Sequence, residues 1–101
     1  MISKNPQIVI RHNLSRQRFE ARVDARLAYL SYTPNGDRVS FDHTYVPDEL
    51  RGQGVAAVLV RAALNEARER HWKIVPRCTY VVTFVERNPE FADLVVPQTR
   101  A

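Results

Sequence analysis

The sequence predicts an α+β fold in which a mixed, mostly antiparallel sheet of about five strands includes one β-α-β unit. Three observations support this class. Short β-branched or aromatic runs separated by turn-forming residues fill the first part of the chain, a long amphipathic run follows a glycine-containing turn, and a short apolar run stops at Pro76. Because the chain has 101 residues, 45% of them hydrophobic, we expect one compact domain over residues 1–101.

The first part of the chain alternates strand and turn patterns. Residues 7–12 and 18–23 have the pattern of strands and are separated by a polar turn at 13–17. A third strand is expected at 27–32, followed by the turn Pro-Asn-Gly-Asp at 34–37. This arrangement predicts a hairpin with the strand that follows.

The return strand of this hairpin, from Val39 to Val46, has two alternating faces. Regular alternation places Val39, Phe41, His43 and Tyr45 on one face, and Ser40, Asp42, Thr44 and Val46 on the other. The strand register decides which face is buried.

The longest helical pattern comes next. Its apolar residues recur at helical spacing and are Val55, Val58, Leu59, Ala62 and Ala63. We expect this helix to start at about Leu50 to Gly52, with Asp48 or Glu49 as its cap, and to end near His71. The apolar run at 73–75 is then a strand parallel to the strand before the helix.

The C-terminal part gives mixed signals. From Cys78 to Glu86 the valines fit one helical face, whereas the run Tyr-Val-Val-Thr-Phe-Val favours a strand. Asn88, Pro89 and Glu90 have the pattern of an N-cap, a first helical residue and a first-turn acid, which predicts a short helix to about Val95.

The turn before the long helix has the features of a phosphate-binding corner. Gly52 and Gly54 leave backbone N–H groups unobstructed at a helix start, where the first amides lack intrahelical partners and the dipole is positive. Arg51 adds a permanent cation whose planar fork suits phosphate oxygens. The alternative is a strand-to-helix connection that needs glycine for its dihedral angles, and the turn alone leaves both interpretations open.

Four short motifs occur in order between Leu27 and Leu94. They are His43-Thr44-x-Val46-Pro47, Arg51-Gly52-Gln53-Gly54, Pro76-x-Cys78-x-Tyr80 and Asn88-Pro89-Glu90-Phe91. With these motifs and Arg51-x-x-Gly54-x-Ala56, the chain resembles the Gcn5-related N-acetyltransferases, in particular a subgroup of very short members. The resemblance spans about two-thirds of the chain.

The resemblance implies a minimal form of that family's fold, a helix from Cys78 to Glu86, and acetyl-CoA as the cofactor. The implied cofactor-binding residues are Thr44, Tyr45, Val46, Arg51, Gly52, Gln53, Gly54, Val55 and Ala56. One departure matters, because full-length members usually insert two helices between their first two strands and use them as a wall for the acceptor. Here only residues 13–17 separate those strands, so the resemblance supports cofactor binding more firmly than any acceptor.

Three side chains are candidates for the chemistry of acetyl transfer, which needs a polarised carbonyl, a neutral amine and a proton for the departing thiolate. The resemblance makes Tyr80 the candidate acid, with packing against the cofactor or the core as its alternative. Cys78, at the same helix N-terminus, can accept the acetyl group covalently or serve as a small buried hydrophobe. His43 can deprotonate an amine, or it can be a hydrogen-bonded structural residue.

Composition narrows the range of partners. Fifteen Lys and Arg against 11 Asp and Glu give a net charge of +4, which favours anionic partners, but no block of basic residues indicates a nucleic-acid partner.

The N-terminus lacks an apolar signal segment, and no stretch has the roughly 20 apolar residues of a membrane helix. We therefore expect a cytoplasmic protein without a membrane segment. Isolated histidines and a single cysteine also predict no metal site.

The sequence leads to two main hypotheses. The first is an acetyl-CoA-dependent N-acetyltransferase whose acceptor is an amine on a protein tail or a polyamine. The second is a CoA- or acyl-CoA-binding module with little turnover, suggested by the missing acceptor wall. A weaker third is a basic adaptor that binds nucleic acid. The acceptor and the oligomeric state do not follow from the sequence.

Overall fold

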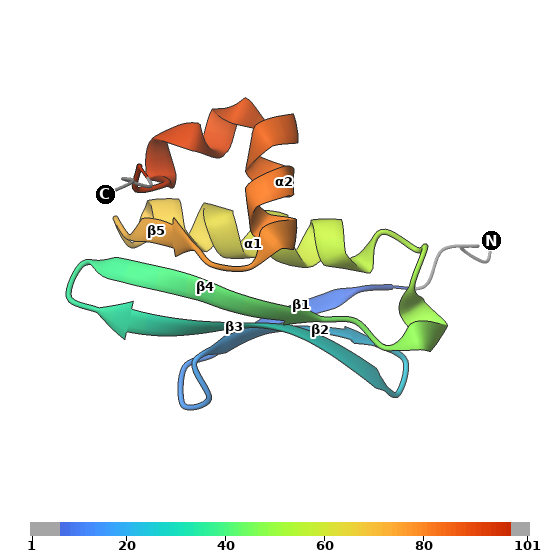
Figure 1. Ribbon diagram of the computed structural model, residues 1–101. Helices are drawn as coiled ribbons and strands as arrows, with labels where there is room; N and C mark the ends of the chain where they lie inside the picture. The colour runs from blue at the N-terminus through green and yellow to red at the C-terminus, as the bar shows by residue number, and fades with distance from the viewer. Residues whose placement is uncertain (1–6, 98–101) are drawn as a thin grey trace.

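The computed structural model describes residues 7–97, which form a five-stranded sheet with helices on one face (Figure 1). The strands β1 (Val9–Asn13), β2 (Arg18–Val23), β3 (Arg26–Asn35) and β4 (Arg38–Tyr45) make an antiparallel meander, and β5 (Lys73–Pro76) lies parallel to β4. The predicted α+β class and mixed sheet are confirmed. The N-terminal residues in which we found no signal segment lie outside the described range.

The β3–β4 hairpin is tighter than expected. Pro34 pairs with Val39 and Asn35 with Arg38, so β3 extends beyond Tyr32 and only two residues form the loop. The first of them, Gly36, has a φ of 68°, the left-handed conformation that a two-residue hairpin loop with glycine in first place requires.

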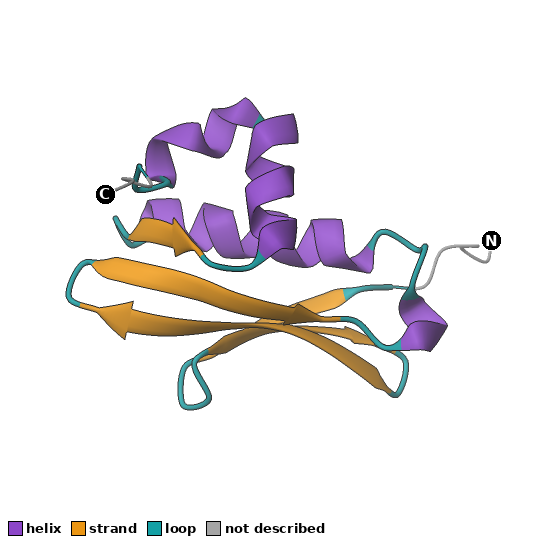
Figure 2. Cartoon of the chain, in the orientation of Figure 1, coloured by secondary structure: helices purple, strands orange, loops and turns teal. Residues whose placement is uncertain are grey.

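The helical elements are η1 (Asp48–Leu50), α1 (Val55–Glu69), α2 (Thr79–Arg87) and η2 (Pro89–Leu94). Figure 2 shows α1, α2 and η2 on one side of the sheet, and no described helix covers the other side. The core lies between these layers, and its largest fully buried side chains include Phe19, Leu30, Phe41, Leu59, Leu64 and Ile74. The conflicting signals at Cys78–Glu86 are thus resolved in favour of a helix, which buries Val81 and Phe84.

The start of α1 differs from our expectation. The chain first makes the separate 3-10 turn η1, and then Gly52 and Gly54 take φ values of 80° and 77°. Left-handed residues cannot continue a right-handed helix, so α1 begins only after Gly54, which is its N-cap and makes no side-chain cap hydrogen bond. The predicted start at Leu50 to Gly52 and the caps at Asp48 or Glu49 are therefore wrong.

The buried face of α1 is also rotated about the helix axis relative to the predicted face, since Val60 and Leu64 are buried while Val58 is 40% exposed.

A β-bulge in β4 reverses which side chains face the helices. Ser31 lies opposite His43 and Tyr32 lies opposite Phe41, so Asp42 is the extra residue. Val39 and Phe41 are buried before the bulge, whereas beyond it Thr44 and Val46 face the helices. His43 and Tyr45 are exposed on the opposite face. The predicted face of Val39, Phe41, His43 and Tyr45 is therefore wrong, because it assumed uninterrupted alternation.

Candidate functional site

The connection between β4 and α1 surrounds a cavity of about 230 Å³. Its lining comes from the end of β4, η1, the glycine turn, the first turn of α1 and one residue of α2. The lining residues are Val46, Leu50, Arg51, Gly52, Gly54, Val55, Ala56, Ala57 and Tyr80. A Cβ added to Gly52 or Gly54 would meet no atom within 4 Å, so both glycines border open space.

Backbone N–H groups gather at this cavity. The first helical hydrogen bond is donated by Val58 to the Gly54 carbonyl, at 3.1 Å. Among the residues that the structure describes, none accepts a hydrogen bond from the amides of Gly52 through Ala57. A run of free donors at a helix N-terminus is a site for an anion, because unpaired N–H groups and the helix dipole both favour negative charge.

Arg51 supplies a cation at the same place. Its Nε lies 3.3 Å from Asp48 Oδ1 and 3.4 Å from the Val46 carbonyl oxygen. The side chains of Arg51 and Asp48 are 70% and 89% exposed, so water screens this ion pair and it stabilises the turn little. The guanidinium can therefore turn toward an anion at a small cost in free energy.

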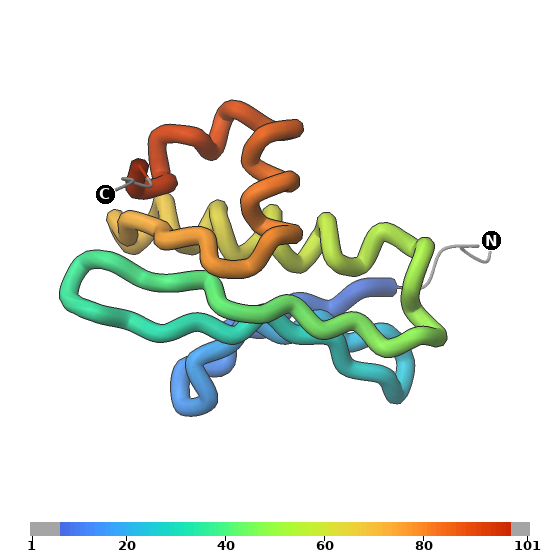
Figure 3. Tube along the Cα trace, viewed as in Figure 1, coloured from blue at the N-terminus to red at the C-terminus, as the bar shows by residue number. Residues whose placement is uncertain are grey.

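The strands β4 and β5 separate at the bulge. Their parallel pairing ends at Phe41 and Pro76, and the Phe41 carbonyl accepts hydrogen bonds from the amides of Arg77 and Cys78. Figure 3 shows the chain after β5 turning away from β4 and rising into α2. Residues 43–45 of β4 thus have no partner in β5, and this edge leads toward the cavity at Val46.

The candidate residues divide into three places. Tyr80, 38% exposed, lines the cavity, and its ring stacks on Phe84 at a centroid distance of 6.5 Å. Cys78 lies beside Thr44, with Sγ and Oγ1 separated by 3.4 Å. His43 lies on the opposite face of the sheet, 6.4 Å from the Tyr29 ring. The structure therefore does not bring His43 together with the other two candidates.

Only some of the predicted cofactor-binding residues line the cavity. The cavity includes Val46, Arg51, Gly52, Gly54, Val55 and Ala56, whereas the side chain of Gln53 donates to the Glu49 carbonyl at 2.9 Å and Tyr45 faces away. Leu50 and Ala57 also line the cavity and were missed. Placing the helix start after the second glycine would have predicted Ala57, since the first-turn amides then extend to it.

The sequence is similar to those of known proteins. The sequence profile of the family described as GCN5-related N-acetyl-transferase matches residues 18–94. The chain belongs to this family. Protein NATD1 of Gallus gallus is 34% identical over 92 residues, which cover 88% of this chain and 84% of the relative. Protein NATD1 of Homo sapiens is 36% identical over 85 residues, covering 81% and 75%.

A solved structure confirms the fold of this family member. The solution structure of a GCN5-like N-acetyltransferase candidate from Staphylococcus aureus matches with a TM-score of 0.69 and 28% identity. The match covers 97% of this chain and 95% of the other. The minimal fold that the sequence motifs implied is therefore correct.

Two further properties concern the described residues only. Within residues 7–97, no group of three His, Cys, Asp or Glu side chains is placed to hold a metal ion. The described helices all lack the length and apolar character needed to cross a bilayer.

Proposed function

We propose that this protein is an acetyl-CoA-dependent N-acetyltransferase whose acceptor is an amine, on a protein tail or a polyamine. The observation that carries the proposal is the run of amides from Gly52 to Ala57 without a protein acceptor, bordering the cavity that Tyr80 lines from the other side. Family membership supports the reaction class.

The residues fit the phosphates of CoA. Gly52 and Gly54 leave the backbone open to close approach, and six consecutive free amides match the many oxygens of a pyrophosphate. Arg51 adds a mobile cation that can pair with the same oxygens. Along β4, the edge without a β5 partner offers backbone groups to an extended ligand in the manner of a further strand.

The protein's side chains then have separate tasks. When bound, acetyl-CoA supplies a thioester whose C–S bond breaks as the acceptor nitrogen forms the new C–N bond. Tyr80 donates its phenolic proton to the departing sulfur. His43 lies on the other face of β4 from Tyr80, so in this proposal the proton of the amine passes to solvent. The α1 amides and Arg51 hold the phosphates and take no part in proton transfer.

Calorimetric titration with acetyl-CoA tests the binding site. Gly54→Val should weaken binding at least tenfold, about 1.4 kcal/mol, because its side chain obstructs the approach to the amides. Gly36→Val is a matched control, since Gly36 also has positive φ and no neighbour within 4 Å of an added Cβ, but lies in the distant β3–β4 hairpin. Equal dissociation constants for folded Gly54→Val and wild type would refute the proposed site.

A second function is favoured by one feature of the sheet. Only residues 14–17 connect β1 to β2, so the two acceptor-wall helices of longer family members are missing from this connection. This favours a CoA- or acyl-CoA-binding module with little turnover. Release of free CoA thiol, measured with a panel of protein-tail peptides and polyamines, distinguishes the two. Tight acetyl-CoA binding without thiol release on any amine would support the binding module.

A further inference from the structure

We propose that the sheet face away from the helices binds single-stranded nucleic acid by base stacking on Tyr29 and Tyr45 and by arginine contacts with phosphates. We call this surface the open face. It consists of the strand side chains that alternate with the buried ones, and no described helix covers it. The inference does not depend on acetyl-CoA binding, because the cavity at Gly52–Ala57 lies on the helix side.

An aromatic cluster lies at the middle of the open face. Tyr29 and Tyr45 are opposite each other on β3 and β4, with ring centroids 5.4 Å apart, and His43 adds a third ring next to Tyr29. Tyr45 is 44% exposed. The Arg18 guanidinium lies 4.7 Å from the Tyr29 centroid. Exposed aromatic rings and arginine planes are the surfaces on which unpaired bases stack.

The open face also carries an excess of positive charge among the described residues. Its cations are Arg11, Arg18, Arg22, Arg38, Lys73 and Arg77, and its only described carboxylates are Glu20 and Asp42. Six cations and two carboxylates give this face a net charge of +4, whereas the other described residues hold seven Arg against nine Asp and Glu. A backbone of phosphates complements such a surface.

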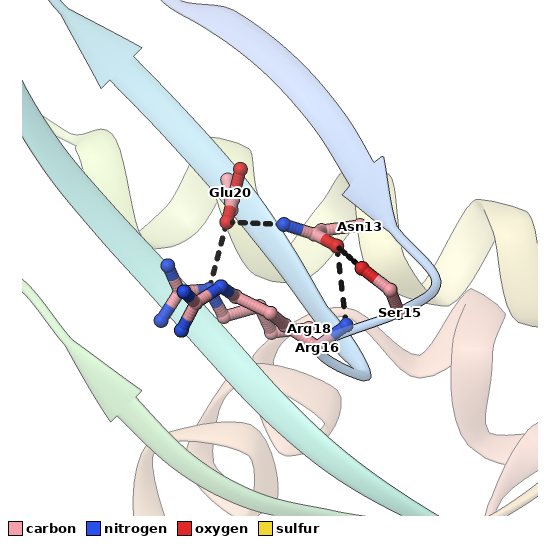
Figure 4. Close-up of polar contacts among 5 residues, drawn as sticks. All are labelled: Asn13, Ser15, Arg16, Arg18 and Glu20. Carbon is pink, nitrogen blue, oxygen red and sulfur yellow. Dashed lines mark hydrogen bonds and ion pairs between the residues drawn. The ribbon is translucent and has the colours of Figure 1, made fainter.

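Both carboxylates of the open face already have partners. Figure 4 shows Glu20 accepting hydrogen bonds from Asn13 Nδ2 at 3.0 Å and Arg18 Nε at 2.7 Å. The two oxygens of Asp42 accept from Thr33 Oγ1 and Ser40 Oγ, each at 2.7 Å. These contacts hold the acids against the sheet. Arg11 lies opposite Glu20 and its charge also acts on that carboxylate, but neither Arg11 nor Arg22 forms an ion pair with a described residue, so both can still contact an external anion.

A hollow extends the open face beyond the tyrosines. It has a volume of about 560 Å³, and both Arg38 and Arg77 line it. The aromatic cluster is therefore flanked by cations toward β1 and β2 on one side and toward the β3–β4 hairpin on the other. A strand of several nucleotides could contact cations on both sides while its bases stack at the centre.

Two other occupants fit less well. A second copy of this face would bring six cations against six, and like charges facing each other oppose association. An acidic protein segment would match the charge but would not need the tyrosine pair, of which Tyr45 is exposed and Tyr29 half-buried. This surface could not be located from the sequence, because alternation along strands separates the cations and only sheet pairing gathers them.

Fluorescence anisotropy with labelled oligouridylate and oligothymidylate of about 12 nucleotides tests the inference. We expect saturable binding of one or both, weakening with salt by a slope of about −0.7 for each phosphate contact. Tyr29→Ala and Tyr45→Ala should each weaken binding at least about fivefold, whereas Tyr45→Phe, which keeps the ring, should retain it. The double variant Arg11→Gln/Arg22→Gln should make the salt slope shallower.

Arg87→Gln provides the charge control, because Arg87 is an exposed cation on α2 in the helix layer. If Tyr29→Ala fails to fold, Tyr45→Ala and the arginine pair still decide the question. Absence of saturable binding at low salt would overturn the proposal. It would also be overturned if Arg87→Gln weakened binding as much as the arginine pair while the tyrosine variants had no effect. Displacement by polyglutamate at equal charge, with the same loss in the tyrosine variants, would assign the face to an acidic protein instead.

Discussion

Thr44 Oγ1 lies 3.4 Å from Cys78 Sγ, and this contact joins β4 to the N-cap of α2 where the pairing of β4 with β5 has ended. Thr44 faces the helices only because the bulge at Asp42 shifts the alternation. Cys78 also packs against the hydrophobic core. The cysteine therefore holds the separated strand and helix in place.

We predict that Cys78→Ala changes the rate of acetyl transfer little and lowers the free energy of unfolding by about 1 kcal/mol, because a packed sulfur is lost. Steady-state kinetics with acetyl-CoA and denaturant unfolding measure the two effects. Mass spectrometry after incubation with acetyl-CoA should detect no acetyl group on Cys78. An acetyl-Cys78 adduct that added amine discharges, together with parallel steady-state lines, would instead show covalent catalysis.

His71 is a second position for a prediction, because its backbone conformation is unfavourable for a residue with a Cβ. It follows the C-cap Arg70 with a φ of 59°, and the amides of His71 and Trp72 donate to the carbonyls of Arg68 and Ala67. This is the helix ending in which glycine is favoured. We predict that His71→Gly raises the free energy of unfolding by about 1 kcal/mol, because the left-handed conformation penalises a Cβ.

Urea unfolding at constant pH measures the His71 effect, and His71→Ala is its control. Alanine keeps the Cβ and therefore keeps the penalty, so it should give no comparable gain. Equal stabilisation by glycine and alanine would mean that the imidazole ring, and not the backbone conformation, sets the cost.

The sequence predicted the elements well because their signals are local. The apolar periodicity of α1 and the alternation in β2 each arise within one element, and the glycine turn was assigned to the correct connection. The later start of α1 was missed because Asp48 and Glu49 are good caps by composition. The left-handed conformation at both Gly52 and Gly54, which delays the helix, is set by the whole connection.

The site was harder to predict because it depends on a bulge. The residues around Asp42 do not predict a bulge, because the extra residue is a property of the pairing between β3 and β4. A one-residue change exchanges the faces of everything beyond it, which is why His43 and Tyr45 were expected beside Phe41. The open face could not be predicted either, because it too depends on how the strands pair. Its cations come from four strands and from the residue after β5.

Stability should fall in mildly acidic solution because of His12. Its Nε2 lies 2.6 Å from the Tyr32 hydroxyl, and its ring stacks on Phe19 at 4.2 Å. Burial, and secondarily the charge of Arg70, lower the pKa of His12 below its ordinary 6.5, while Glu66 opposes the change. The unfolded chain therefore binds this proton first, so stability is complete above about pH 6.5 and decreases as the pH falls toward the folded-state pKa.

Urea unfolding across a pH series measures this dependence. His12→Gln should remove the decrease just below pH 6.5, whereas His71→Ala should retain it. A separate loss at lower pH is expected from Asp93, because hydrogen bonds from Arg68 lower the pKa of that carboxyl below its ordinary 3.8. An unchanged pH profile in His12→Gln would assign the mildly acidic decrease to another group.

Tyr80 is the residue on which the proposed catalysis depends most directly. Its hydroxyl belongs to the only described tyrosine at the cavity, and its ring contact with Phe84 does not need the oxygen. We predict that Tyr80→Phe lowers kcat about 100-fold or more and leaves the acetyl-CoA dissociation constant unchanged, because the proton is needed only in the transition state. Tyr32→Phe is the matched control, since it removes a phenolic hydroxyl that contacts His12 away from the cavity and should not affect kcat. If Tyr80→Phe retained full kcat, the proton for the departing thiolate would have to come from solvent, and Tyr80 would be only a packing residue of the cofactor site.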